Sequence, residues 1–225
     1  MRVGLLVLVL VFVTPGGGVD SFVGRVAVYG DAGAAHVAVV VPGSDVDGAR
    51  FDATVGRMAR SLHDVVGADV AVVAWLGYRT PSGLGVDAAS GRLARAGAEA
   101  LVRYVRSLSG HVHLLCHSYG SVVCAMAVRD VRVDDVVFLG SPGVRVSTVD
   151  ELGTSARVWA ARGARDWTRW VPAVRVGDLG HGADPVSPSF GAVVFDVGDA
   201  RHDGYFESGS ASLRALAAIA RGGRP

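Results

Sequence analysis

The sequence predicts an α/β fold built on a largely parallel sheet, and three observations lead to this prediction. Apolar, β-branched runs recur along the 225 residues, and most of them are separated by segments with helical periodicity. The runs are continuously apolar rather than alternating, which is typical of strands buried on both faces. Half of the residues are hydrophobic, so a chain of this length can bury a sizeable core. The simplest organisation is one domain over residues 1–225.

Eight of these apolar runs are predicted to be strands, namely 3–13, 24–30, 36–43, 69–77, 111–116, 134–139, 156–161 and 192–197. Four segments are predicted to contain helices that cover both faces of the sheet, namely 51–66, 87–109, 119–129 and 207–221. No helix separates the first two strands, so we expect them to form an antiparallel edge. The segment between strands 134–139 and 156–161 is too short to hold a large lid.

The first 18 residues admit two interpretations. Arg2, the apolar run 3–13 and the small residues of "TPGGG" together resemble a signal peptide. However, no A-x-A cleavage site follows the run, and the run is too short to span a bilayer. A β-branched run that ends at Pro15 and three glycines also predicts a buried strand, and we favour the strand. A cytoplasmic location is therefore favoured over a secreted one.

The composition argues against several classes of function. The net charge is +1 and no basic run is present, so nucleic acid is not an expected partner. All 22 basic residues are Arg, which excludes a Lys nucleophile or Schiff base. No Gly-rich dinucleotide motif follows the first strand, no P-loop is present, and no Cys/His spacing resembles a zinc site. We therefore expect neither a cofactor nor a metal, and no integral membrane span.

The stretch "HLLCHSYGSVV", residues 113–123, carries the strongest chemical signal. A polar interruption that begins at His117 separates a predicted strand from a predicted helix. Such a turn can be an ordinary tight connection, or it can raise Ser118 as a nucleophile at the carboxyl edge of the sheet. A strained nucleophile turn needs small residues two positions before and after the serine. Gly120 meets this requirement, whereas Cys116 stands where glycine is expected.

The two cysteines, Cys116 and Cys124, are eight residues apart, at the end of a predicted strand and within the following helix. We expect both to be buried thiols rather than a disulfide, with Cys116 acting as a packing residue. Cysteine usage therefore does not fix the redox compartment.

A serine nucleophile needs a base, and the base needs an acid that orients it. His202 follows the last predicted strand and is the preferred base, with His181, which precedes that strand, as its rival. Asp166 follows the seventh predicted strand and is the preferred acid, with Asp184 as the alternative. The chain order of Ser118, Asp166 and His202 is that of α/β-hydrolases and differs from the orders of chymotrypsin and subtilisin.

The oxyanion of an acyl-transfer intermediate needs two backbone N–H donors. Tyr119, the residue after the proposed nucleophile, is expected to supply one of them. Ser44, in the segment "PGSDVDG" after the third predicted strand, is the preferred second donor. Gly43 and Asp45 are alternatives for the second donor.

Four residues are expected to line the substrate site, namely Gly43, Trp75, Tyr78 and His117. Trp75 and Tyr78 lie at the end of the fourth predicted strand, where they would contact an apolar acyl group or pack in the core. His117 is expected to shape the turn or the pocket rather than to act as the base.

The order and spacing of several segments resemble those of actinobacterial α/β-hydrolases that are classified as a domain of unknown function. The segments are "VVVPGSD", "VVAWLGYRTP", "LLCHSYGS", "FLGSPGV", "VWAARGARDW", "DLGHGADPVSPSFGA" and "HDGYF". The resemblance runs from about residue 20 to the C-terminus, and members of the family usually have glycine at the position of Cys116. It implies an α/β-hydrolase fold with Ser118 as the nucleophile, and it supports Asp166 and His202 as its partners. It implies no substrate.

These residues predict a serine hydrolase that cleaves a small-molecule carboxylic ester through an acyl-enzyme. Without a large lid, the site favours short or medium acyl chains over triglyceride at an interface. The same triad would also serve an acyltransferase. A catalytically silent domain used for binding is the alternative from another class, and Cys116 is the feature in its favour. The oligomeric state is not predicted.

Overall fold

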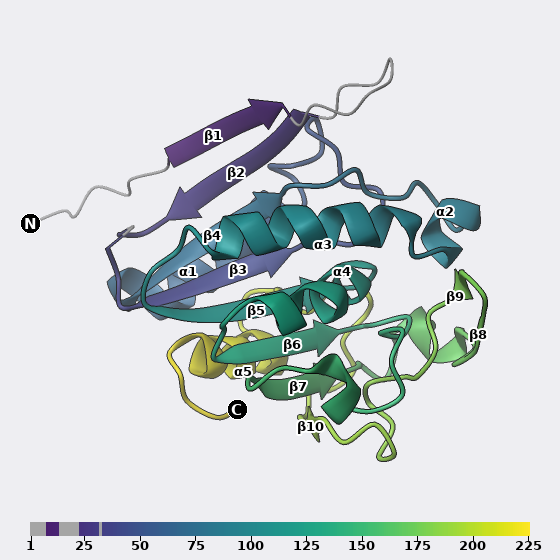
Figure 1. Ribbon diagram of the computed structural model, residues 1–225. Helices are drawn as coiled ribbons and strands as arrows, with labels where there is room; N and C mark the ends of the chain where they lie inside the picture. Colours follow the sequence, from purple (N-terminus) through teal and green to yellow (C-terminus); the bar gives the residue numbers. More distant parts are fainter. Residues whose placement is uncertain (1–7, 14–22, 32) are drawn as a thin grey trace, which may run out of the picture.

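The computed structural model describes residues 8–13, 23–31 and 33–225, and its centre is an eight-stranded sheet (Figure 1). The strands are β1 (Leu8–Val13), β2 (Val23–Tyr29), β3 (His36–Val41), β4 (Val70–Leu76), β5 (His111–His117), β6 (Asp135–Leu139), β7 (Arg157–Ala161) and β10 (Val193–Val194). Their spatial order is β1-β2-β4-β3-β5-β6-β7-β10.

Strand β2 runs antiparallel to both of its neighbours, β1 and β4, and the sheet is parallel from β4 to β10. The predicted antiparallel edge is therefore confirmed. Part of the segment 1–18 lies outside the described residues, and its interpretation as a cleaved signal peptide stays a prediction.

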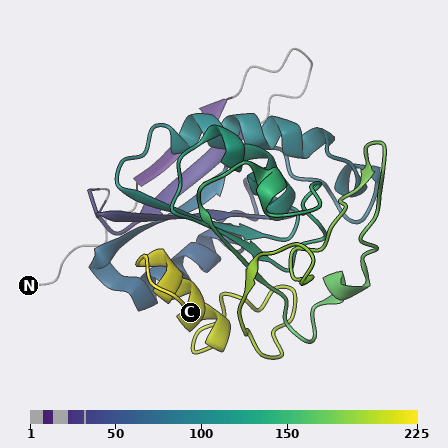
Figure 2. The same ribbon diagram turned by 60° about the horizontal axis from the view of Figure 1, so that its bottom comes forward.

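The sheet is the middle of three layers (Figure 2). Helices α3 (Arg92–Val105) and α4 (Gly120–Ala127) cover one face, and α1 (Val55–Val66) and α5 (Ala211–Ala220) cover the other. Strand β4 is buried along its whole length, and β3 is buried after its first residue. Burial on both faces explains why the parallel strands are continuously apolar in sequence. No helix in the described part of the chain is long and apolar enough to cross a membrane.

The helix predicted at 87–109 is divided into α2 (Val86–Ala89) and α3. The break falls at Ser90 and Gly91, where a Cβ added to Gly91 would lie 2.7 Å from Cζ of Arg145. The Tyr119 hydroxyl bridges the break, because it donates to the carbonyl of Ser90 and accepts from the N–H of Ala94. Tertiary packing therefore sets the start of α3.

No lid domain separates β6 from β7, as predicted; the connection contains only a short 3₁₀ helix, η3 (Asp150–Leu152). The longer connection from β7 to β10 contains the 3₁₀ helix η4 (Trp167–Trp170) and a hairpin of β8 (Arg175–Val176) and β9 (Leu179–Gly180). The hairpin lies beyond the carboxyl ends of the parallel strands, on the right of Figure 1. The sequence patterns did not predict it, because each of its strands has only two residues.

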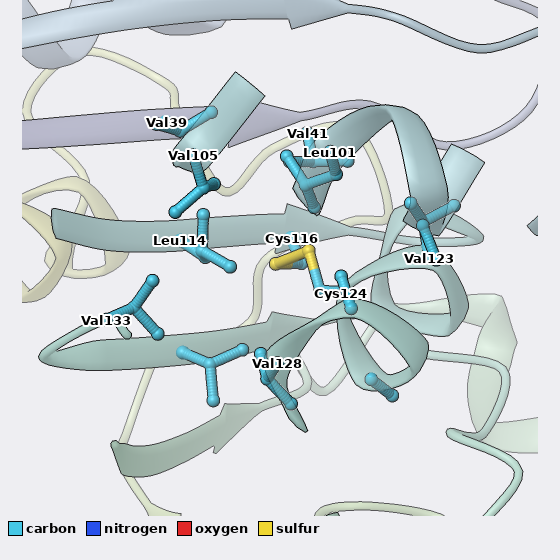
Figure 3. Close-up of a cluster of buried hydrophobic side chains, with 14 of the residues drawn as sticks. Val39, Val41, Leu101, Val105, Leu114, Cys116, Val123, Cys124, Val128 and Val133 are labelled. Carbon is cyan, nitrogen blue, oxygen red and sulfur yellow. A yellow bond between two sulfur atoms is a disulfide. The ribbon is translucent and has the colours of Figure 1, made fainter. Parts of the chain in front are cut away.

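The prediction of two free thiols is wrong. Cys116, in β5, and Cys124, in α4, form a disulfide inside the core between the sheet and the helices (Figure 3). Both residues are fully buried, as expected. The sharp turn after β5 folds α4 back over the strand, so the two Cα atoms are 6.4 Å apart, within the range that a disulfide spans. Cys116 is thus a cross-link as well as a packing residue.

Candidate active site

Ser118 lies on the turn between β5 and α4 and has a left-handed backbone conformation, with a φ of 54°. A residue other than glycine in this region stores about 1–3 kcal/mol of strain, which the surrounding structure must offset. The N–H of Ser118 donates to the carbonyl of Leu139 at 2.8 Å, which ties the turn to β6.

Two glycines allow the loop after β3 to pass directly against this turn. A Cβ on Gly43 would lie 2.5 Å from Cβ of Ser118, and a Cβ on Gly120 would lie 2.6 Å from the carbonyl oxygens of Val41 and Pro42. The small residue expected two positions after the serine, Gly120, is therefore required because the loop after β3 leaves no room for a side chain there.

The structure brings Ser118, His202 and Asp166 into one chain of hydrogen bonds. The distance from Ser118 Oγ to His202 Nε2 is 2.9 Å. His202 Nδ1 lies 2.9 Å from Asp166 Oδ1 and 3.1 Å from Oδ2. In the tautomer that fits these contacts, Nδ1–H donates to the carboxylate and Nε2 accepts from the serine hydroxyl.

The two alternatives for base and acid have other partners. His181 Nε2 donates to the carbonyl of Ala88 at 2.7 Å, so this ring is held away from the serine. Asp184 pairs with Arg162 and accepts from the N–H of Val186. Neither contact leads to Ser118.

The carboxylate of Asp166 is fully buried and accepts several hydrogen bonds. The N–H and the hydroxyl of Thr168 both donate to Oδ1 at 2.8 Å, and the Tyr205 hydroxyl donates to Oδ2. Burial by itself raises the pKa of this carboxyl, but the hydrogen bonds from His202, Tyr205 and Thr168 outweigh it and hold the pKa well below its usual range. The group is therefore an anion that can orient His202 and stabilise a positive charge on it.

His117 holds the backbone of His202 in place. Its Nε2–H donates to the carbonyl of His202 at 2.7 Å, and the two rings are 4.7 Å apart between centroids. Burial and the charge of His202 lower the pKa of His117 to about 4, so its ring is neutral at pH 7. On another side of His202, the ring of Trp167 lies 4.8 Å away. His117 also borders the open space in front of Ser118, in line with the expectation that it shapes the pocket.

Tyr119 directly follows Ser118, and Ser44 follows Gly43, which lies against Ser118; within the described part of the chain, the N–H groups of Tyr119 and Ser44 donate to no other group. The N–H of Asp45 donates to the carbonyl of Pro81 at 2.9 Å, so it is already used. The hydroxyl of Tyr78 donates to the carbonyl of Pro42 at 2.7 Å, and this hydrogen bond stabilises the loop after β3.

Trp75 and Tyr78 pack in the core, which is the second of the two alternatives that the sequence left open for them. Both side chains are buried on the α3 face of the sheet, where their rings stack with centroids 6.0 Å apart. Trp75 is the penultimate residue of β4 and points into the core rather than toward the sheet edge. Tyr78 packs under Gly97, whose added Cβ would lie 3.0 Å from the tyrosine Cγ.

With this geometry established, comparison with known proteins decides the family. The sequence profile of the alpha/beta hydrolase family matches residues 20–176. The chain belongs to the alpha/beta hydrolase family. The matched region contains Ser118 and Asp166 and ends before His202, so the position of His202 beside them rests on the geometry alone.

Curated relatives of this alpha/beta hydrolase occur in mycobacteria. It is 30% identical over 237 residues to the uncharacterized protein Rv2079 of Mycobacterium tuberculosis, covering 84% of this chain and 35% of that protein. It is 38% identical over 92 residues to the uncharacterized protein Rv0963c of the same organism, covering 37% of this chain and 34% of that protein. The chain thus spans about a third of the length of the curated relatives that it matches.

Solved structures support the fold of this alpha/beta hydrolase. A dienelactone hydrolase from Anabaena variabilis has a TM-score of 0.60 at 15% identity, covering 96% of each chain. A serine hydrolase without a lid from Xanthomonas campestris has a TM-score of 0.54 at 17% identity, covering 96% of this chain and 92% of that chain. At these identities the likeness establishes the fold alone.

Two open cavities of the alpha/beta hydrolase meet at Ser118. The first, which we call the charged chamber, has a volume of about 460 Å³; besides apolar residues such as Val46 and Met58, its border includes His117, His202 and four charged residues, Asp45, Arg50, Arg57 and Asp203. The second, which we call the apolar chamber, has a volume of about 440 Å³ and is bordered mainly by Ala88, Ala89, Trp170, Val171, Pro172 and Val174. Both volumes are in the range of small-molecule sites.

Four residues border both chambers, namely Ser44, Leu84, Ser118 and Trp167. Gly43, predicted to line the site, borders the charged chamber.

The sequence patterns did not point to Leu84 or Trp167. They also did not point to Thr168 and Tyr205, the two residues that donate hydrogen bonds to Asp166 in addition to His202. The segment "HDGYF" places Tyr205 three residues after His202, but nothing in the sequence indicates that its hydroxyl turns back to Asp166. Among the described residues, no group of three or more His, Cys, Asp or Glu side chains could hold a metal ion.

Proposed function

We propose that this alpha/beta hydrolase is a serine hydrolase that cleaves a small-molecule carboxylic ester through an acyl-enzyme. The observation that carries the proposal is the unbroken hydrogen-bond chain from Ser118 Oγ through His202 to a buried Asp166 carboxylate. An ordinary strand-to-helix turn needs neither this chain nor the left-handed backbone at Ser118. We also infer that residues 1–225 act as one domain, because the triad comes from loops at one edge of one sheet.

The first half of the reaction forms the acyl-enzyme. Ser118 Oγ attacks the carbonyl carbon of the ester while His202 Nε2 takes the serine proton. The N–H groups of Tyr119 and Ser44 stabilise the resulting oxyanion, and the anionic Asp166 stabilises the imidazolium. His202 then gives the proton to the alcohol oxygen as the carbon–oxygen bond breaks.

The second half releases the acid. A water molecule enters the place of the alcohol, and His202 takes a proton from it as the water oxygen attacks the acyl carbon. Collapse of the second tetrahedral intermediate returns that proton to Ser118 Oγ. The products are the carboxylic acid and the free enzyme.

Active-site labelling with a fluorophosphonate probe tests this proposal. We expect the probe to label the wild type, and we expect Ser118→Ala to abolish both the label and the hydrolysis of p-nitrophenyl acetate. Ser121→Ala is the matched control, because Ser121 lies in the first turn of α4, three residues after Ser118, and its hydroxyl donates to the carbonyl of Cys116 rather than to His202. A folded wild type that neither reacts with the probe nor cleaves esters would favour the silent binding domain.

A further inference from the structure

The two chambers that meet at Ser118 differ in chemistry, and the difference points to a substrate class. We propose that the substrate is an ester of an apolar acyl group with a hydroxyl-rich alcohol. The acyl group lies in the apolar chamber, and the alcohol lies in the charged chamber. This inference rests on the proposed serine hydrolase function and adds the polarity of each half of the substrate.

The two chambers lie next to each other at Ser118, so the two halves of an ester bound there would enter different chambers. Ser118 and Ser44 border both chambers, while Leu84 and Trp167 contribute to both of their walls. An ester carbonyl that reaches Ser118 Oγ therefore has one substituent in each chamber. The two halves of the substrate meet two different environments.

The position of His202 decides which half lies where. During formation of the acyl-enzyme, His202 Nε2–H gives its proton to the alcohol oxygen, and the acyl group stays bonded to Ser118 Oγ. The alcohol oxygen must therefore be within reach of His202, which borders the charged chamber and not the apolar one. Tyr119 and Pro142 border only the apolar chamber, which is left for the acyl chain.

The charged chamber carries two positive and two negative side chains. The guanidinium groups of Arg50 and Arg57 form no ion pair within the described chain, and each bonds only to a backbone carbonyl, at 3.4 Å and 3.2 Å. Asp45 and Asp203 add two carboxylates, so the four charges cancel. Hydroxyl groups can donate to the carboxylates and accept from the guanidiniums, whereas an anionic alcohol would meet the carboxylates as well.

The apolar chamber opens between η4 and the β8–β9 hairpin. At its border, the side chains of Trp170 and Val174 are 79% and 60% exposed. An acyl chain in the chamber would remove part of this apolar surface from water, which favours binding in proportion to the area covered. An acetyl group would cover less of this surface than a longer acyl chain and would gain less from it.

Three esters measured below their micellar concentrations test the assignment. 1-Octanoylglycerol and propyl octanoate share the acyl group and the three-carbon alcohol, and only the first carries free hydroxyls. 1-Acetylglycerol shares the alcohol and shortens the acyl chain. We expect kcat/KM for 1-octanoylglycerol to exceed both of the others by about tenfold or more. Equal values, or faster cleavage of propyl octanoate, would overturn the inference. A fourth ester, 1-octanoylglycerol 3-phosphate, tests for selection of charge, and cleavage of this ester faster than that of 1-octanoylglycerol would also overturn the inference.

Two pairs of variants assign the preferences to the chambers. Arg57→Met should lower the ratio of 1-octanoylglycerol to propyl octanoate cleavage by about tenfold, while Arg60→Met, on the same helix outside the chamber, leaves this ratio unchanged. Val174→Asp should lower the ratio of octanoyl to acetyl cleavage, while Val176→Asp, two residues along and 79% exposed, leaves it unchanged. Equal effects within a pair would contradict the assignment.

Labelling separates the failure of this inference from the failure of the proposed function. A wild type that reacts with the fluorophosphonate probe but shows no preference among the three esters refutes only the substrate class. A wild type that does not react with the probe refutes the serine hydrolase itself.

Discussion

Two His–Asp pairs lie at opposite edges of the same sheet, and their comparison shows what makes such a pair a site. At the carboxyl edge, His202 Nδ1 bonds to Asp166 and Nε2 meets the hydroxyl of Ser118. At the amino edge, His113 Nδ1 bonds to Asp135 at 2.7 Å and Nε2 meets Nδ1 of His36 at 3.0 Å. In both pairs Nδ1 of the histidine bonds to the carboxylate, and the pairs differ in what surrounds them.

The amino-edge pair is closed on every side. His113 and Asp135 are fully buried, and the carboxylate also accepts from Arg157 at 2.7 Å and from Trp159 Nε1 at 2.6 Å. At the carboxyl edge, the third partner is a hydroxyl on a strained turn, and open chambers lie beside it. A His–Asp pair can therefore serve catalysis only where the histidine has a free side and a nucleophile to activate.

Replacing the two carboxylates gives the largest expected contrast. Asp166→Asn should lower kcat by about 10³–10⁴-fold, because the amide no longer stabilises the imidazolium or holds the required tautomer. Asp135→Asn should leave kcat per folded molecule within about threefold but cost about 1–3 kcal/mol, because the amide cannot accept all the hydrogen bonds that His113, Arg157 and Trp159 give to the buried carboxylate.

Both quantities can be measured on the same samples, with p-nitrophenyl acetate for kcat and urea unfolding for stability. If Asp135→Asn stays folded and loses kcat as strongly as Asp166→Asn, the prediction that catalysis depends on Asp166 and not on Asp135 is wrong.

A methyl group placed against the serine should have the next largest effect. Gly43→Ala puts a Cβ at 2.5 Å from Cβ of Ser118 and 2.9 Å from its Oγ, so the turn or the β3 loop must move. We expect kcat to fall by about 10²-fold, since displacements of about 1 Å cost this much. Gly48→Ala in the same loop is the control, because no atom lies within 4 Å of its added Cβ. A similar loss in both variants would mean that loop flexibility, and not contact with Ser118, is responsible.

Acid should destabilise both edges, with the larger contribution at the carboxyl edge. The folded pKa of His117 is about 4, below the value of 6.5 of an unfolded chain. Between these values the unfolded chain binds a proton that the folded chain does not, so stability that is present above pH 6.5 is lost as the pH falls through this window. At pH 5 the loss from His117 is about 2 kcal/mol.

His36 contributes in the same direction at the amino edge. Burial and the charges of His113 and His111 lower its pKa, while Asp134 and Asp135 oppose the shift. His36 is only partly buried, so we expect His117→Gln to flatten the loss between pH 7.5 and pH 5 more than His36→Gln does. Urea unfolding at the two pH values measures this, and the reverse order would locate the acid sensitivity at the amino edge.

The fold and the centre of the site were accessible from sequence because they depend on order along the chain. Parallel strands end at one edge of the sheet, so the polar residues directly after each strand pointed to Ser118, Asp166 and His202, which the structure brings together. Their catalytic roles stay proposals.

The failures concern side-chain direction and partners. Trp75 lies in β4 and Tyr78 two residues after it, but periodicity in a fully buried strand does not say which face or edge a side chain meets, so the sequence left their packing open. The pairing of Cys116 with Cys124 depends on how sharply the turn folds α4 back, which a separation of eight residues does not reveal. The contacts of Tyr205 with Asp166 and of Tyr78 with Pro42 are tertiary and leave no pattern in the sequence.

The disulfide beside Ser118 is inaccessible to reductants once the protein has folded. Thiol–disulfide exchange requires that a thiolate reach a sulfur atom, and both Cys116 and Cys124 have no exposed surface in the folded chain. The oxidation state of Cys116 and Cys124 is therefore determined before the core forms, and it does not change afterwards in the folded protein. Preparations folded under oxidising and reducing conditions would be two distinct covalent forms, and reductant added to the native protein would not make them the same.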